Sequence, residues 1–234
     1  MRSIWRTLDP PLLRDVAAVA AGAAVNGASF GAIAVASGLA WWMPTAMSVL
    51  VFAGGAQFMA VGVVAAGGSP AAAVIAGLVL NSRHLPFGLA VGDVLGRSWL
   101  GRLVGSHLLI DETVAFALAQ RDPARARAAY WACGVSLFVA WNVGVIGGAL
   151  AGRAVGDPGA FGLDAAFPAA LLALVLPALR DAATRRAALL GAAVALATTP
   201  LLPAGVPVLL SLFGLVAAVG GPAAASTRAN QEVS

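Results

Sequence analysis

Charged residues are scarce in this sequence, and lysine is absent. Only 10% of the 234 residues are charged, whereas a soluble domain carries about 25%. Hydrophobic residues make up 60% of the chain, and its mean hydropathy is +0.90. Too little polar surface remains to cover a water-soluble globule. The composition therefore predicts an all-α polytopic membrane protein, because helices satisfy their own backbone hydrogen bonds in lipid.

Cysteine is nearly absent as well. Cys133 is the only one, so no disulfide forms within the chain. The 14 basic residues are all arginines, and the formal net charge is +4. In a soluble protein such basicity would suggest a nucleic-acid partner, but here most of the arginines lie in loops between apolar runs. We expect them to orient the protein with its positive loops in the cytoplasm, and we expect no nucleic acid to bind.

The two ends of the chain are more polar than its middle. Residues 1–15 lack the apolar run and cleavage site of a signal peptide, and we expect them to form a cytoplasmic N-terminal leader. Residues 16–220 are expected to form a single transmembrane transport domain, followed by a polar tail over residues 221–234. The loops are too short to hold a soluble catalytic module.

Seven or eight hydrophobic segments approach the length of about 20 residues that a membrane helix needs. They cover residues 16–39, 43–66, 70–92, 103–120, 129–151, 160–179, 187–202 and 204–220. Prolines crowd the last two segments, which leaves the number open. Several tryptophans near segment ends are expected to lie at the membrane interface, namely Trp41, Trp42, Trp99, Trp131 and Trp141.

The arginines leave two ways of threading the chain through the membrane. Eight full crossings would place Arg97 and Arg102 outside, against the expected excess of positive charge inside. If residues 43–66 and 103–120 instead dip into the membrane and return on the same side, both arginines lie inside. Both segments have the glycines or polar residues that broken or re-entrant helices would need.

Two stretches combine small residues with amides. In "VNGASFG", Asn26 and Ser29 share a helix face, and Gly27 and Gly31 form a small-xxx-small pair that favours close helix packing.

In "FAGGAQF", the pair Gly54-Gly55 weakens a helix by roughly 1 kcal/mol per glycine, and Gln57 follows directly. A helix broken there would present free amides and carbonyls for a substrate. The alternative is a flexible packing site.

The stretch "NSRHLP" places charge near the midpoint of an apolar run. Pro86 has no N–H, so the carbonyl of Ser82 loses its helical partner, and a kink or break is expected there. Asn81, Arg83 and His84 lie on the turn just before this proline. Arg83 can bind a carboxylate through two parallel hydrogen bonds, and His84 can change charge near neutral pH.

A second charged stretch, "SHLLIDET", follows. His107 and Asp111 are four residues apart and are expected to share a helix face, with Glu112 about 100° around it. These groups indicate a proton or cation path, unless the two acids are simply solvated at a membrane edge. Arg83 alternatively pairs with Asp111 or Glu112 and only holds helices together. Neither stretch has a familiar metal-ligand spacing.

Several of these motifs, in this order, resemble one family. "FAGGAQF", "NSRH", "IDET" (residues 110–113), "WN" (141–142) and "GLDAAFPAALLAL" (162–174) resemble AzlC-type branched-chain amino-acid permeases, the large subunits of two-component exporters. The resemblance implies a permease of the bacterial inner membrane, and the arginines Arg2, Arg6 and Arg14 predict that its N-terminus is cytoplasmic. It also implies export of hydrophobic amino acids such as valine, leucine and isoleucine, and a small AzlD-type membrane subunit as partner.

Charge matching suggests how such a substrate would bind. Its carboxylate would contact Arg83 or the amides after Gly55, its ammonium Asp111 or Glu112, and its apolar side chain Phe58. The predicted substrate-binding set is Gly54, Gly55, Gln57, Phe58, Asn81, Arg83, Asp111 and Glu112. The predicted proton-coupling set is His84, His107 and Asp111. No cofactor, metal or enzyme activity is expected, and an ion or small-solute channel is the alternative function.

Overall fold

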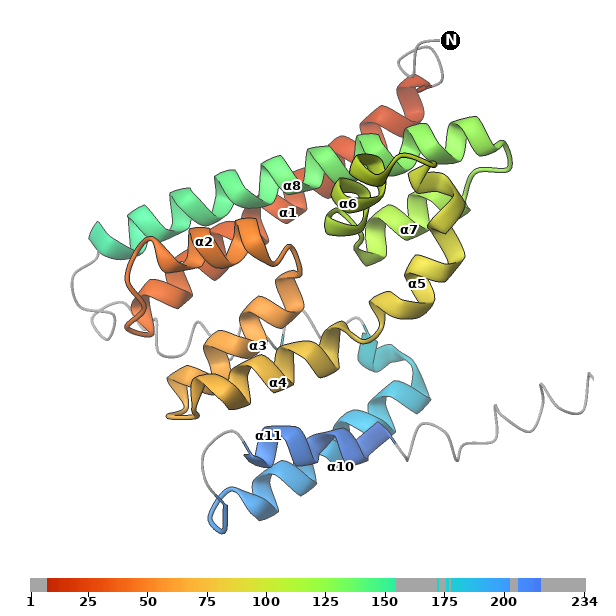
Figure 1. Cartoon of the computed structure of the whole chain (residues 1–234). Helices are drawn as coiled ribbons and strands as arrows, with labels where there is room; N and C mark the ends of the chain where they lie inside the picture. Colours follow the sequence, from red (N-terminus) through yellow and green to blue (C-terminus); the bar gives the residue numbers. More distant parts are fainter. Residues whose placement is uncertain (1–7, 155–171, 173–175, 177, 203–205, 216–234) are drawn as a thin grey trace, which may run out of the picture. The chain divides into compact units, whose positions relative to one another are not determined.

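The computed structural model describes residues 8–154, 172, 176, 178–202 and 206–215, and its regular elements in these ranges are all helices (Figure 1). The all-α prediction is confirmed for this part of the chain. Three described helices are long and apolar enough to cross a membrane, namely Pro10–Ala36, Pro70–Leu95 and Pro123–Ala154. The structure therefore supports a membrane protein, and the total of seven or eight segments stays a prediction.

The described part of the chain contains a few long helices and many short ones. In chain order they are α1 (Pro10–Ala36), α2 (Met43–Leu50), α3 (Gly54–Ala65), α4 (Pro70–Asn81), α5 (His84–Val91), η2 (Gly92–Leu95), α6 (Trp99–His107), α7 (Asp111–Leu118), α8 (Pro123–Ala154), η4 (Ala178–Arg180), α10 (Ala182–Thr198), α11 (Val206–Leu210) and η5 (Ser211–Gly214). They belong to two compact units. The first comprises Met1–Phe58 and Gly77–Asp164, and the second comprises Met59–Ala76 and Ala165–Ser234.

Some of the predicted hydrophobic segments are continuous helices in the structure, and others are broken. Residues 16–39 and 129–151 fall largely within the long helices α1 and α8, as expected. Residues 43–66 and 103–120 are each broken into two helices, as the sequence allowed. The segment 160–179 lies almost wholly outside the described residues, as does the tail over 221–234.

The first unit is organised by close packing of α1 against α8, which lie side by side in Figure 1. A Cβ atom added to Gly27 would overlap the backbone of Trp141, and one added to Gly31 would overlap the backbone of Val145. The predicted small-xxx-small face is therefore confirmed. Ser29, on the same helix, donates its hydroxyl hydrogen to Val25 O within α1.

Helices α1 and α8 run parallel to each other. Gly144 packs on Ala24, and Gly148, one turn further along α8, packs on Ala28, one turn further along α1. Matching this direction, the guanidinium of Arg125 near the start of α8 pairs with Asp9, which caps α1 by accepting a hydrogen bond from Leu12 N. Both helices thus begin at the same end of the unit.

Other arginines lie at this same end. Gly96 lies against the Arg127 guanidinium, and its φ of 83° is a conformation that favours glycine. Arg102 Nε donates to Gly96 O at 3.2 Å, so the start of α6 lies beside the start of α8. At the opposite end of α8, Arg153 lies over the ring of Trp41 at 5.8 Å.

The second unit contains a smaller helical assembly. Helix α10 begins after Asp181, whose carboxylate accepts from Thr184 N at 2.7 Å. Gly214 of η5 packs directly on the backbone of α10 near Gly191. Elsewhere in the unit, Val63 and the alanines of α4 form a small buried cluster.

Candidate functional site at three broken helices

The first break separates α2 from α3 at residues 51–53. Helix α2 is fastened to α8 by Ser48, whose hydroxyl donates to Asn142 Oδ1 at 2.8 Å. Asn142 Nδ2 in turn donates to Phe138 O at 2.8 Å. Ser48 is fully buried and Asn142 nearly so. Because buried polar groups need partners, this pair fixes how α2 sits on α8.

Gln57 closes the first break. Its Nε2 donates to Val51 O, which also accepts from Ala53 N at 2.8 Å where α2 ends, and its Oε1 accepts from Trp141 Nε1 at 3.2 Å. The side chain is 2% exposed. With both amide atoms already bonded, Gln57 holds the broken backbone in place. Phe58 is also packed, with its ring centroid 5.4 Å from that of Phe30.

Trp141 was expected at the membrane interface, and for this residue the expectation is wrong. It lies within α8, is 7% exposed, and stacks near Phe30 at 6.1 Å between ring centroids. Its indole is fixed by Gln57. Trp41, Trp42 and Trp99 have exposed side chains on the protein surface, where interfacial anchors would contact the membrane.

The second break separates α4 from α5 at Ser82 and Arg83, as predicted from Pro86. The Ser82 carbonyl accepts from Leu85 N at 3.1 Å, in the tighter three-residue pattern that the missing proline N–H imposes. His84 Nδ1 lies 3.0 Å from Asn81 O. The break falls at the middle of the span Pro70–Leu95.

The third break separates α6 from α7 at residues 108–110. Ile110 N donates to the Thr113 hydroxyl at 3.0 Å, which caps α7. The prediction that His107 and Asp111 share one helix face is therefore wrong, because His107 ends α6 and Asp111 begins α7. Acids in the first turn of α7 lie where the helix dipole favours negative charge.

The hairpin formed by α6 and α7 reaches the middle of α8 and turns back. Tyr130 OH donates to Gly105 O at 2.8 Å, and Gly134 lies against Leu108 and Thr113. Further along α7, Ala117 packs again in the cluster around Tyr130. The chain thus approaches the centre of α8 in α6 and returns in α7.

The first and third breaks meet at Phe138, near the middle of α8. The Phe52 ring lies 5.2 Å from the Phe138 ring, and the His107 ring lies 5.7 Å from it. Phe52 belongs to the first break and His107 borders the third. Two half-length helices from different parts of the sequence therefore end at the same level of α8.

An ion pair joins the second and third breaks. Arg83 Nη1 donates to Asp111 Oδ2 at 2.7 Å, with 41% and 46% of the two side chains exposed. Arg83 Nη2 also lies 3.8 Å from the Cβ position of Gly55, at the start of α3. Glu112 is exposed and is not the partner of Arg83. Of the predicted residues, Gly55, Arg83 and Asp111 are thus brought together, with Asn81 and His84 on the adjoining turn.

The region that holds all three breaks matches a known family. The model of the AzlC protein family matches residues 18–155, more than half of the chain. This chain belongs to the AzlC family. AzlC proteins are membrane transport proteins, which agrees with the apolar spans. No curated protein and no solved structure matches the chain.

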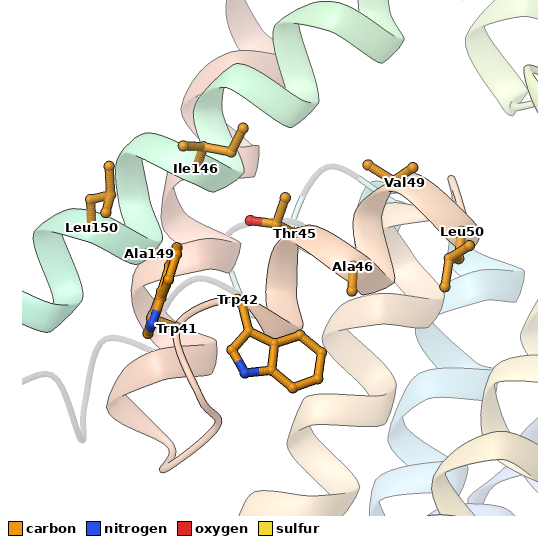
Figure 2. A pocket seen from close by; sticks show the side chains of 9 residues that line it. All are labelled: Trp41, Trp42, Thr45, Ala46, Val49, Leu50, Ile146, Ala149 and Leu150. Carbon is orange, nitrogen blue, oxygen red and sulfur yellow. The ribbon is translucent and has the colours of Figure 1, made fainter.

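A groove of about 610 Å³ lies on this AzlC protein between α2 and α8 (Figure 2). Its lining is apolar apart from Thr45 and consists of Trp41, Trp42, Thr45, Ala46, Val49, Leu50, Ile146, Ala149 and Leu150. None of the predicted site residues lines it. The groove is a lipid-compatible surface and is distinct from the polar centre at the breaks.

Sequence reasoning missed three residues that build the AzlC centre. Ser48 and Asn142 fasten α2 to α8, and Thr113 caps α7. A signal was present for Asn142, since an amide in the middle of an apolar helix needs a partner. Among the described residues, no three histidine, cysteine or acidic side chains gather as a metal set would.

Proposed function

We propose that this AzlC protein exports hydrophobic amino acids, chiefly valine, leucine and isoleucine, across the inner membrane of a bacterium. The observation that carries the proposal is the meeting of Arg83, Asp111 and the start of α3 at three helix breaks. Discontinuous helices near mid-membrane hold charged substrates in many secondary transporters. A zwitterion with an apolar side chain matches one cation and one anion placed together in an apolar protein.

The proposed orientation places the starts of α1 and α8 in the cytoplasm. Arg102, Arg125 and Arg127 lie at that end, and this concentration of positive charge supports the assignment. Helices α6 and α7 then form a re-entrant hairpin from the cytoplasmic side. Helix α2 enters from the opposite side, since its first turn lies near Ala149 and Leu150.

In the proposed binding mode the Arg83–Asp111 ion pair opens to admit the substrate. The guanidinium takes the substrate carboxylate in a bidentate contact, with the positive end of the α3 helix dipole close by at Gly55. Asp111 takes the ammonium. A zwitterionic substrate supplies one anion and one cation, so it can replace both contacts of the ion pair and compete with it.

Export against a gradient requires a coupled ion, and we propose a proton carried by His84, His107 or Asp111. We also propose that the chain acts with a small AzlD-type subunit. Gln57 and Phe58, both packed in the core, serve in this account to hold the first break in shape.

Counterflow in membrane vesicles tests this function against the alternative of a channel. Vesicles carrying the chain and a small AzlD-type subunit are loaded with unlabelled L-leucine and diluted into trace labelled L-leucine. A transporter gives a transient accumulation of label that saturates with concentration and is not supported by D-leucine. Non-saturable flux without stereochemical preference would instead assign a channel.

A further inference from the structure

Unpaired acceptors are concentrated at the second and third breaks. Within the described residues, four solvent-shielded side-chain atoms lack a hydrogen-bond partner. Three of them are Asn81 Oδ1, His84 Nε2 and Asp111 Oδ1, and the fourth is Trp131 Nε1 on α8. Native proteins leave few such groups unpaired, so a cluster of three indicates a place where a ligand supplies the missing partners.

The tautomer of His84 follows from its one contact. Nδ1 lies 3.0 Å from the backbone oxygen of Asn81, and a carbonyl can only accept. The Nδ1 atom therefore carries the hydrogen and donates it. In the neutral ring the Nε2 atom is then an acceptor with a free lone pair, and it is the atom without a partner.

The three unpaired atoms lie on residues that are linked in the structure. Asn81 and His84 flank one turn and are joined by the hydrogen bond to Asn81 O, while Asp111 is tied to that turn through Arg83. All three atoms are acceptors, and Asp111 adds a negative charge. A primary ammonium, with three N–H donors and one positive charge, has the complementary chemistry.

We propose that the ammonium of the amino-acid substrate binds to Asn81 Oδ1, His84 Nε2 and Asp111 Oδ1, and that a proton competes with it for His84 Nε2. This inference rests on the proposed function and assigns its coupling step. A proton that adds to the Nε2 lone pair turns the atom into a donor and the ring into a cation. The ammonium then has lost one acceptor and faces a like charge.

Mutually exclusive binding produces exchange of substrate for proton. The site changes its access from one side of the membrane to the other while it holds either an amino acid or a proton on His84. Export of one is therefore coupled to entry of the other. The charged groups to consider are Arg83 in the same turn as His84, and those on two elements packed against α5, namely Asp111 and Glu112 on α7 and Asp93 on η2. The acids stabilise either cation, and only His84 Nε2 distinguishes them.

The test uses the full chain, with its small subunit where flux needs it, in proteoliposomes that contain a pH-sensitive dye. In the wild type, lowering the pH should raise the KM for L-leucine without changing the maximal rate, and each leucine exported should bring in a proton. His84→Asn keeps a donor near the Nδ1 position and removes Nε2. It should raise the KM about tenfold, lose its pH dependence and still perform leucine–leucine exchange.

Two further arms separate the outcomes. Arg125→Lys, which alters an ion pair outside the proposed site, should retain the pH-dependent KM, and 4-methylpentanoate, which is leucine without its amino group, should not compete with leucine. The inference is overturned if wild-type KM is independent of pH, if His84→Asn still imports protons, or if the deaminated analogue competes well. Leucine exchange without proton movement would overturn the coupling step and leave the transporter standing, whereas absence of any amino-acid flux would remove the proposed function itself.

Discussion

Two arginine–aspartate ion pairs of similar exposure provide a matched comparison at the scale of single residues. Arg83 pairs with Asp111 at the helix breaks, and Arg125 pairs with Asp9 at the end of α1 and α8. Arg83→Lys keeps the charge and loses the bidentate geometry. We expect it to raise the KM for leucine about tenfold or more, because a hydrogen bond to a charged group contributes about 1.5–3 kcal/mol.

The control for this prediction is Arg125→Lys, measured in the same counterflow assay. It alters an ion pair of the same type outside the proposed site, so its KM should equal that of the wild type. Equal effects of the two substitutions would mean that Arg83 only holds helices together, the alternative that the sequence left open.

Asp9 gives a prediction on pH. The Arg125 guanidinium beside it, together with the hydrogen bond from Leu12 N, holds the pKa of this carboxyl below its ordinary value. A lowered pKa in the folded state means that the contact stabilises the protein above the ordinary pKa. That stabilisation is lost as the pH falls through the folded-state pKa.

Asp9→Asn tests this, because asparagine is an equally good helix cap and removes only the charge. In detergent, the wild type should have the higher Tm at neutral pH, and the difference should shrink as the pH falls below about 4, the ordinary pKa of an aspartate. A difference that persists unchanged at low pH would contradict a contribution from the ion pair.

From the sequence, the centre at the helix breaks could be predicted only at single residues whose side chains are unusual for an apolar segment. Charge inside an apolar run pointed to Arg83 and Asp111, which the structure joins. Gln57 was predicted as a substrate contact because it directly follows the glycine pair, yet its amide is occupied by Val51 and Trp141. A sequence shows that a buried amide needs partners, but not whether the partners belong to the protein or to a ligand.

At the scale of helices, the close packing of α1 on α8 predicts opposite tolerance to alanine at two neighbouring glycines. A Cβ at Gly148 would overlap the carbonyl of Ala28, whereas one at Gly147 would meet nothing within 4 Å. Gly148→Ala should therefore destabilise the protein by about 1–3 kcal/mol, the usual cost of overpacking. Gly147→Ala should be neutral, and thermal unfolding in detergent compares the two.

Helix breaks were predictable where the chemistry is local. Pro86 removes one backbone donor, and the break at Ser82 and Arg83 follows. A break within residues 103–120 was expected in one of the two threadings, but its position at residues 108–110 was not, and His107 and Asp111 were wrongly placed on one face. Its signal was the acidic pair Asp111-Glu112 beginning a helical turn, with Thr113 as cap. The pattern of apolar residues does not reveal this break, because the leucines and isoleucine at residues 108–110 are compatible with either a helix or a turn.

At the scale of the whole molecule, the parallel direction of α1 and α8 restricts the topology. The chain between two parallel spans must cross the membrane an odd number of times. One crossing by Pro70–Leu95 with two re-entrant hairpins satisfies this, and so do three full crossings. The proximity of Arg102 to Gly96 and Arg127 favours the hairpins, because it keeps these arginines at one end.

Labelling of single cysteines distinguishes the two arrangements. In a Cys133→Ala background, Ala66→Cys and Ser98→Cys place thiols at exposed positions between α3 and α4 and before α6. A membrane-impermeant maleimide should label Ala66→Cys in intact cells and Ser98→Cys only after permeabilisation. Ready labelling of Ser98→Cys from outside would contradict the re-entrant arrangement.

Efflux from amino-acid-loaded cells tests the central claim most directly. Cells fed with dipeptides of valine, leucine or isoleucine express the chain alone or with a small AzlD-type subunit, each as wild type, Arg83→Ala and Arg125→Ala. Faster efflux with the wild type and with Arg125→Ala, lost in Arg83→Ala at equal membrane abundance, is the predicted result. Unchanged efflux in Arg83→Ala, or no efflux of any of the three amino acids, would contradict the account.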